Sequence, residues 1–264
     1  MNNLALTKPI SARFEAVSSI DSTQTALLSR SSHDLPHGYT LVAGHQTAGR
    51  GRLTRDWHDA AGQALLMSTI VRINSDDHHF ELLPLIAGVA VQHALHEVVS
   101  DVQLKWPNDI VIQIAGENRK LGGIVASIHP DSTTTAQIIV LGIGINLSFE
   151  GSNRPTEQSG AIADFTTTPP TREQLAVDIV NQLHRALQEP LAHTMDSYRS
   201  LCATLGKTVK VTPLDGSVVI GVATAVQDDG SIKVITDDGD RVFLSADIEP
   251  VSYTHLRAHE TLRY

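Results

Sequence analysis

The sequence is poor in cysteine and in positive charge. Its one cysteine, Cys202, excludes an internal disulfide and suits a reducing compartment. The apolar neighbours Leu201 and Ala203 favour a packing role for this thiol. Lysine and arginine together number 20 against 29 aspartate and glutamate residues, and the resulting net charge of -9 disfavours a general nucleic-acid-binding surface.

Long apolar segments are also missing from the sequence. No uninterrupted apolar run reaches the length of about 18 residues that a membrane-spanning helix needs. Residues 1–13 contain no basic stretch followed by an apolar one, as a secretory signal would require. With 41% hydrophobic and 19% charged residues, the composition is that of a globular protein. We therefore expect a soluble cytoplasmic protein that binds neither membranes nor nucleic acid.

One short segment concentrates arginine and glycine against this acidic background. Residues 49–57 read Gly-Arg-Gly-Arg-Leu-Thr-Arg-Asp-Trp, and they show neither helical nor strand periodicity, which predicts a mobile loop. Glycine lets the backbone approach a ligand closely, and arginine grips phosphate or carboxylate with two hydrogen bonds. The segment therefore favours an anion-binding loop over the alternative, a solvated basic turn.

Hydrophobic periodicity outlines strands and helices before residue 205. Apolar and β-branched runs predict strands, and an apolar 3.6-residue repeat that follows a capping box of Thr171 and Gln174 predicts a helix. A similar repeat covers residues 77–100, whose four histidines lack metal-ligand spacing. The predicted strands span residues 14–20, 39–45, 64–72, 102–106, 110–114, 120–125 and 137–147, and the predicted helices span residues 25–30, 77–100, 171–189 and 192–205.

Composition changes near residue 205. Residues 206–251 contain four basic residues and eight carboxylates. They form a unit of strand-like runs separated by Asp-Gly turns. The runs lie at residues 208–212, 218–226, 231–236 and 241–244. We therefore predict a domain of residues 1–205 and a small β-barrel of residues 206–251. Residues 252–264 show no strand alternation after this completed barrel, so we expect a non-native tail and assign His255 and His259 no metal role.

Three further segments combine glycine or proline with polar residues. Residues 105–109, Lys-Trp-Pro-Asn-Asp, place a turn between two predicted strands, because proline cannot continue a central ladder. Paired glycines at 122–123 and alternating glycines at 142 and 144 suggest that a ligand or another backbone comes close. Each glycine could instead serve packing alone. Packing is also the favoured role of the two tryptophans, Trp57 and Trp106.

Taken together, these segments resemble one family. Gly-Arg-Gly-Arg-x-x-Arg-x-Trp at 49–57, Lys-Trp-Pro-Asn-Asp at 105–109, Lys-Leu-Gly-Gly-Ile at 120–124 and Gly-Ile-Gly-Ile-Asn at 142–146 look like the motifs of biotin–protein ligases. The resemblance implies an α+β fold, with a mixed β-sheet and helices on one side as in class II aminoacyl-tRNA synthetases, followed by an SH3-like β-barrel. Because residues 1–13 are too few for a DNA-reading helix pair, we expect the short form without an N-terminal DNA-binding domain.

The resemblance implies a ligase reaction in two steps. The carboxylate of biotin attacks the α-phosphorus of ATP to give biotinyl-5′-AMP, and a lysine of the biotin carboxyl carrier domain of a carboxylase then displaces AMP. Both first reactants are anions, so the site must offset their repulsion with positive charge. Mg²⁺ is expected to arrive with ATP, and Asp109 is the one protein group considered as its ligand. A monomer or weak homodimer is expected.

The resemblance also assigns roles to individual residues. The expected catalytic residues are Arg52, Lys105, Asp109 and Lys120. The residues expected to contact biotin are Ser22, Thr23, Gln46, Gly49, Arg50, Arg52, Lys120 and Gly123. The residues expected to contact ATP or the adenylate are Arg50, Arg52, Arg55, Trp57, Lys105, Asn108, Lys120, Gly142, Gly144 and Asn146.

Other interpretations of these residues stay open. Ser22 and Thr23 could act only as helix caps, and Asp109 only as a turn cap. A lipoate–protein ligase or octanoyl transferase would share a similar fold, but those relatives lack the alternation of glycine and arginine. A non-catalytic biotin sensor is disfavoured by the presence of both Lys105 and Lys120.

Overall fold

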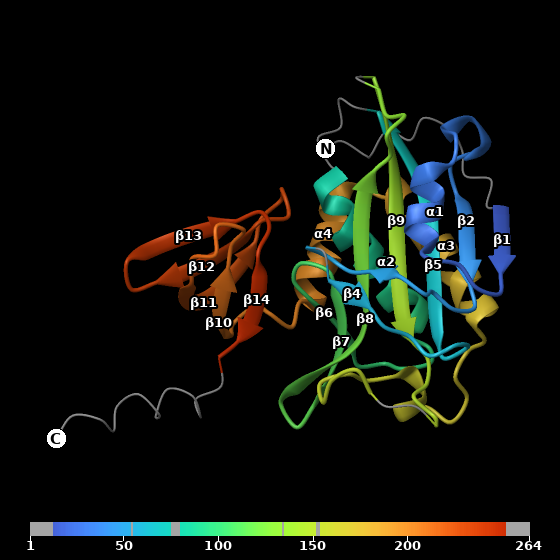
Figure 1. The fold of residues 1–264 in the computed structure, drawn as a ribbon. Helices are drawn as coiled ribbons and strands as arrows, with labels where there is room; N and C mark the ends of the chain where they lie inside the picture. The colour runs from blue at the N-terminus through green and yellow to red at the C-terminus, as the bar shows by residue number, and fades with distance from the viewer. Residues whose placement is uncertain (1–12, 54, 75–79, 134, 152–153, 252–264) are drawn as a thin grey trace.

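The main element of the fold is a seven-stranded sheet with the strand order β1-β2-β5-β9-β8-β7-β6 (Figure 1). It is taken from a computed structural model that describes residues 13–53, 55–74, 80–133, 135–151 and 154–251. β1 and β2 pair in parallel and the other neighbours pair antiparallel, so the expected mixed sheet is confirmed. In the order given, the strands span Arg13–Val17, Tyr39–Ala43, Ala64–Asn74, Ala136–Asn146, Glu117–Ile128, Asp109–Ile114 and Val102–Lys105.

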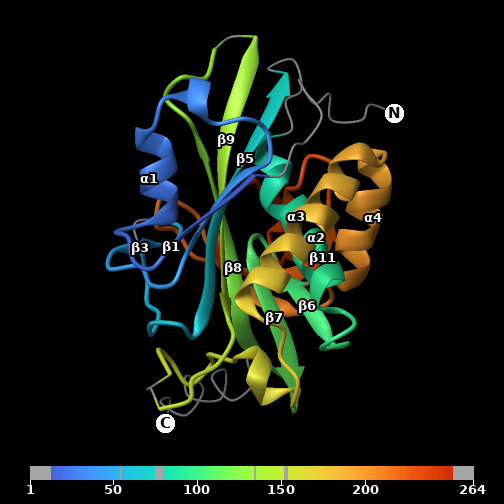
Figure 2. The same ribbon diagram turned by 90° about the vertical axis from the view of Figure 1, so that its right-hand side faces the viewer.

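Helices cover both faces of this sheet. α2 (Leu83–Leu95), α3 (Arg172–Gln188) and α4 (Leu191–Leu201) lie on one face, and α1 (Thr23–Ser29) lies on the other (Figure 2). Side chains alternate along β5 accordingly: Leu65 and Met67 enter the large core that includes α2 and α3, whereas Ile70 enters a smaller core with Leu27 of α1. The expectation that helices lie on one side only was therefore wrong.

Polar capping residues mark where α1 and α3 begin. The Ser22 hydroxyl accepts a hydrogen bond from the Thr25 backbone N–H and caps α1, and Thr171 caps α3 in the same way. α2 is shorter than predicted, since it follows a 3₁₀ turn at Phe80–Leu82 and ends at Leu95. The first part of the helix predicted for residues 77–100, which includes His78 and His79, falls outside the described residues. None of the described helices is both long and apolar enough to cross a membrane.

The arginine-rich segment, residues 49–57, forms a hairpin and is called the arginine hairpin below. β3 (Gly49–Arg50) pairs antiparallel with β4 (Asp56–Trp57). Glycine at 49 permits this pairing, because a Cβ there would lie 2.6 Å from the Trp57 carbonyl oxygen. The expectation of a loop without strands was wrong at both ends of the segment. The hairpin lies on the α1 side of the main sheet (Figure 2).

A second, antiparallel sheet follows α4 and has the strand order β13-β12-β11-β10-β14 (Figure 1). Its edge strands, β13 and β14, are not paired with each other in the described part of the chain, so closure into an SH3-like barrel stays a prediction. The boundary at 205 also stays a prediction, and the tail at 252–264 lies outside the described residues. In chain order the strands span Thr208–Thr212, Val219–Val226, Ile232–Thr236, Gly239–Phe243 and Asp247–Pro250.

The two sheets share a continuous core. Trp106 is buried between them: its Nε1 donates to the Gly230 carbonyl oxygen at 2.9 Å, and its backbone N–H donates to the Thr204 hydroxyl at 3.0 Å. Val211 of β10 belongs to the same buried cluster as Leu104 of β6. This packing confirms the structural role favoured for Trp106, and it brings β14 close to the arginine hairpin.

Candidate active site

One cavity collects most of the predicted site residues. It lies on the α1 face of the main sheet and is bounded by the arginine hairpin and by β14 of the second sheet. The predicted residues that line it are Ser22, Thr23, Gln46, Arg50, Arg52, Arg55, Trp57, Lys105, Asn108, Asp109, Lys120, Gly123, Gly142 and Gly144. Side chains from segments far apart in the sequence therefore meet at one place.

Near β5, hydroxyl and amide groups form a chain at the cavity wall. Gln46 Oε1 accepts hydrogen bonds from the backbone N–H of Thr23 at 2.7 Å and from its hydroxyl at 3.0 Å. Thr23 Oγ1 lies 2.8 Å from Oγ of Ser68, which is on β5. Because a backbone nitrogen can only donate, these contacts fix the orientation of the Gln46 amide group and leave Nε2 as its outward end. The wall can therefore offer both donors and acceptors to a polar ligand.

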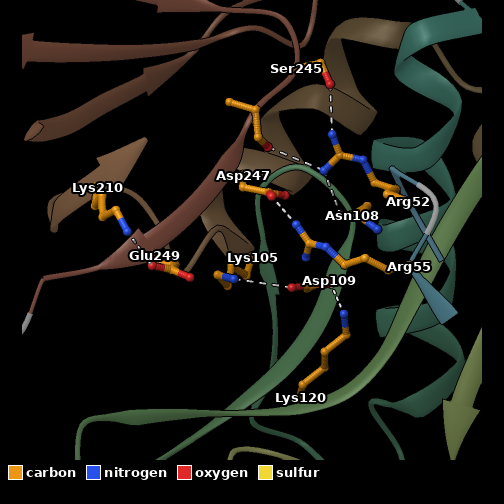
Figure 3. Close-up of polar contacts among 11 residues, drawn as sticks. Arg52, Arg55, Lys105, Asn108, Asp109, Lys120, Lys210, Ser245, Asp247 and Glu249 are labelled. Atoms are coloured by element: carbon orange, nitrogen blue, oxygen red, sulfur yellow. Dashed lines mark hydrogen bonds and ion pairs between the residues drawn. The ribbon is translucent and has the colours of Figure 1, made fainter. Parts of the chain in front are cut away.

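In the same cavity, where β6 ends and β7 begins beside β8, two lysines contact one carboxylate (Figure 3). Lys120 Nζ lies 2.5 Å from Asp109 Oδ1, and Lys105 Nζ lies 3.3 Å from Asp109 Oδ2. Burial alone would raise the pKa of Asp109, but the two ammonium groups and their hydrogen bonds hold it below its ordinary value. The one negative charge of Asp109 thus lies beside the two positive charges of Lys105 and Lys120. The excess of positive charge suits an anionic ligand.

Two arginines of the hairpin reach across to the second sheet (Figure 3). Arg52 donates to the Ser245 hydroxyl at 2.8 Å and to Asn108 Oδ1 at 3.3 Å. Arg55 forms an ion pair with Asp247 of β14. Burial lowers the pKa of Arg52, but the ordinary value for arginine is so high that the guanidinium stays charged. The second sheet thereby forms one wall of the site and holds positive charge beside the lysines.

Glycine flattens the floor of the cavity. Gly142 and Gly144 on β9 alternate with Leu141 and Ile145, which belong to the main core, so the glycines face the cavity. A Cβ on Gly144 would lie 2.8 Å from the ring of Trp57. Trp57 therefore rests directly on the strand and closes the base of the hairpin. Its Nε1 is buried and has no hydrogen-bond partner in the described part of the protein.

Gly49 and Asn146 are the predicted residues outside the cavity lining. Gly49 is needed for the close pairing of the hairpin. Asn146 Nδ2 donates to the carbonyl oxygens of Gly160 at 3.0 Å and Lys120 at 3.4 Å. In this arrangement Asn146 supports the backbone beside Lys120, and its predicted contact with adenosine stays a prediction.

Among the lining residues that the sequence did not assign to the site are three with polar side chains, Gln24, Ser68 and Asp247. Ser68 interrupts an apolar strand, and the period-2 rule could have placed it on the same face as the glycines of β9. Gln24 follows the capping residues of α1 and donates to the Ser127 hydroxyl at 2.9 Å. Asp247 begins a four-residue strand that carried no alternation signal.

The site does not fit a metal ion held by the protein alone. The described residues contain no cluster of three or more histidine, cysteine, aspartate or glutamate side chains arranged for a metal. Asp109, the one candidate, is already engaged by two lysines. Cys202 is buried, and burial raises the pKa of its thiol, so it offers no thiolate.

Comparison with known proteins assigns this fold and site to a class. Residues 16–146, which contain α1, the arginine hairpin and both lysines, match the biotin/lipoate A/B protein ligase family. The chain therefore contains a domain of this family.

Relatives in sequence carry biotin ligase names. The biotin--[acetyl-CoA-carboxylase] ligase of Mycobacterium tuberculosis is 28% identical over 248 residues, which cover 88% of this chain and 89% of that protein. The bifunctional ligase/repressor BirA of Bacillus subtilis is 28% identical over 87% of this chain and 71% of its own length. The Escherichia coli protein of the same name is 29% identical over 83% of this chain.

Solved structures agree with the fold. The biotin protein ligase of Aquifex aeolicus in complex with biotin and ATP superposes with a TM-score of 0.75 at 23% identity, covering 90% of this chain and 99% of that one. The Leishmania major ligase with biotinyl-5-AMP gives a TM-score of 0.62 at 22% identity, covering 92% of this chain and 100% of that one. At this level of identity the likeness establishes the architecture alone.

Proposed function

We propose that this protein is a biotin–protein ligase. It joins biotin and ATP into biotinyl-5′-AMP and then transfers biotin to a lysine of a biotin carboxyl carrier domain. The observation that carries the proposal is a single cavity with the amide and hydroxyl chain of Thr23, Gln46 and Ser68 on one side and Lys105, Lys120 and Arg52 on the other. The names of the related proteins support it.

The first step needs positive charge where a carboxylate meets a phosphate. A biotin carboxylate oxygen bonds to the α-phosphorus of ATP, the bond from that phosphorus to the bridging oxygen breaks, and pyrophosphate leaves. Lys105 and Lys120 stand side by side on Asp109, and either can turn from this carboxylate to a phosphate oxygen. Such fixed charges stabilise the transition state more than they would in water. Arg52 supplies a further guanidinium from the hairpin.

The second step needs the mixed anhydride to be kept from water. The amine of the acceptor lysine bonds to the acyl carbon, AMP leaves with the bonding electrons, and a proton is lost from nitrogen. The arginine hairpin, with Trp57 on Gly144, covers one side of the cavity and excludes solvent there. Asp109 contacts both lysines, so the ammonium group of the acceptor lysine would meet the Asp109 carboxylate as it enters.

The polar wall favours biotin over lipoate or octanoate within this family. A ureido ring has two N–H donors and a carbonyl acceptor, which suit the hydroxyls of Thr23 and Ser68 and the Nε2 of Gln46. A dithiolane ring or an alkyl chain would leave these groups unpaired. A site built to hydrogen-bond its substrate rejects analogues without such groups strongly.

Several finer features belong to the same proposal. Mg²⁺ accompanies the phosphates of ATP, since the described residues offer no ready cluster for it. The second sheet is of the SH3-like kind and helps to hold the nucleotide through the contacts that Ser245, just before β14, and Asp247 of β14 make with the hairpin. The acceptor is a carboxylase domain. The protein acts in the cytoplasm as a monomer or weak homodimer. Residues 206–251 form its second domain.

A direct test is ATP–pyrophosphate exchange with the purified protein and three acids offered separately. Exchange that requires biotin, with none from lipoate or octanoate, is the expected result. Exchange driven by lipoate or octanoate would show that this acid, and not biotin, is the substrate. Tight binding of biotinyl-5′-AMP without any exchange would instead indicate a sensor.

A further inference from the structure

The arginine hairpin leaves and rejoins the main sheet through a narrow neck. On the entering side, Gly44 to Gln46 run beside residues 18–20, and the Ile20 N–H donates to the His45 carbonyl oxygen at 3.1 Å. On the returning side, the Gly62 N–H donates to the Gly44 carbonyl oxygen at 3.0 Å. Between these backbone contacts, one side chain joins the two sides of the neck.

That side chain is Asp59, and it is fully buried. Its Oδ2 lies 2.8 Å from His45 Nδ1, and its Oδ1 accepts a hydrogen bond from the Gln46 backbone N–H at 3.4 Å. Both carboxylate oxygens are therefore engaged with the entering side. Because a buried carboxylate is unfavourable unless it is paired and hydrogen-bonded, the Asp59 carboxylate depends on its contacts with His45 and Gln46.

Gln46 connects the neck to the cavity. Its backbone is held by Asp59, and its side-chain Oε1 is occupied by the two donors of Thr23. The amide can then present only Nε2 to a ligand, because both hydrogen bonds with Thr23 use Oε1. No hydrogen bond of Nε2 is found among the described residues. A shift of the Gln46 backbone would move this donor and strain both contacts with Thr23.

We propose that Asp59 is a positioning residue for the acid-binding end of the cavity. It touches no substrate, and it acts through the Gln46 backbone and the His45 ring at the neck of the arginine hairpin. The inference rests on the proposed function, since biotin is the ligand that Gln46 would meet. Lys105 and Lys120 stand on other strands across the sheet, so Asp59 governs the affinity for biotin more than the affinity for ATP.

Two substitutions separate this role from a merely structural one. Asp59→Ala removes both acceptor oxygens, whereas Asp59→Asn keeps an acceptor for the Gln46 N–H and can donate to His45 Nδ1. Biotin-dependent ATP–pyrophosphate exchange gives KM for biotin and for ATP, and kcat, for each variant. Titration calorimetry gives biotin affinity independently of turnover. His58→Ala, the exposed neighbour, is the matched control.

We expect Asp59→Ala to raise KM and Kd for biotin about tenfold while KM for ATP stays within about twofold, as the loss of a charge-assisted hydrogen bond predicts. Asp59→Asn should restore most of the affinity. A biotin KM in Asp59→Ala like that of the parent protein, even with a lower Tm, would overturn the proposal. If Asp59→Ala does not fold, His45→Ala takes its place, because it unpairs the same carboxylate; a raised biotin KM supports the role and an unchanged one refutes it. A parent protein without exchange would refute the proposed function instead.

Discussion

Lys105 and Lys120 both contact Asp109, so neither ammonium group is neutralised by a partner of its own. The register explains the meeting: Lys105 pairs with Asp109 across the turn at Pro107, and Gly123 pairs with Asp109 from the other side. The first contact follows from the short turn and could be predicted. The contact of Lys120 with Asp109 depends on an irregular register between Ile110 and Val111, which no sequence pattern predicts.

Lys120→Ala should slow the first step on the order of 100-fold or more, because it removes a fixed charge from the developing transition state. Biotin-dependent ATP–pyrophosphate exchange measures this step alone. Lys233→Ala is the control, since Lys233 pairs with Asp240 on the second sheet and lines no part of the cavity. Exchange at the parent rate in Lys120→Ala would contradict the assignment.

At the scale of elements, the arginine hairpin and β14 act as a pair. Arg52 donates to Ser245 and Arg55 pairs with Asp247, so two segments nearly two hundred residues apart fix one another. The hairpin residues could be picked out from the sequence because glycine and arginine alternate there. β14 could not, because four residues containing an aspartate, a glutamate and a terminal proline give no strand pattern.

Arg52→Ala should speed the release of biotinyl-5′-AMP by about tenfold or more, because the proposed role of Arg52 is a charge-assisted hydrogen bond to the phosphate of the adenylate. Release can be followed by displacing labelled adenylate with an excess of unlabelled adenylate. Arg154→Ala, which breaks an ion pair with Asp164 away from the cavity, is the matched control. An unchanged release rate, with the fold intact, would refute this role of Arg52.

At the scale of the whole molecule, the sequence was most informative where periodicity was strong. The long strands β5 and β9 and the capped helix α3 were predicted close to their observed ends. The position of α1 on the opposite face could not be predicted, because its short apolar pattern does not say which face of the sheet it covers. The shared core around Trp106 could not be predicted either, because it depends on how the second sheet packs against the first.

Acid should weaken the whole fold through His37. Its ring is 1% exposed, its Nδ1 accepts the Arg72 backbone N–H at 2.9 Å, and burial lowers its pKa from 6.5 to about 4. The folded state therefore keeps the ring neutral, and protonation favours unfolding. Stability from this residue is complete above pH 6.5 and falls as the pH drops toward 4, by roughly 2 to 3 kcal/mol at pH 4.5.

His37→Asn should flatten this decline, because the amide oxygen can accept the Arg72 N–H without titrating. Urea unfolding at pH 7.5 and at pH 4.5 measures the difference, with the exposed His33→Asn as control. Carboxylates such as Glu15, whose pKa its hydrogen bond to Arg30 lowers from 4.5 to about 2, lose their contribution at lower pH. The same slope in His37→Asn and in the parent protein would exclude His37 as the cause.

The proposed function requires that this cavity activates biotin and passes it to a lysine. Transfer of labelled biotin, with Mg-ATP, to a purified biotin carboxyl carrier domain measures both steps together. We expect labelling that requires ATP and disappears when the acceptor lysine is replaced by arginine. An acceptor that stays unlabelled in the presence of active, biotin-binding protein would contradict it.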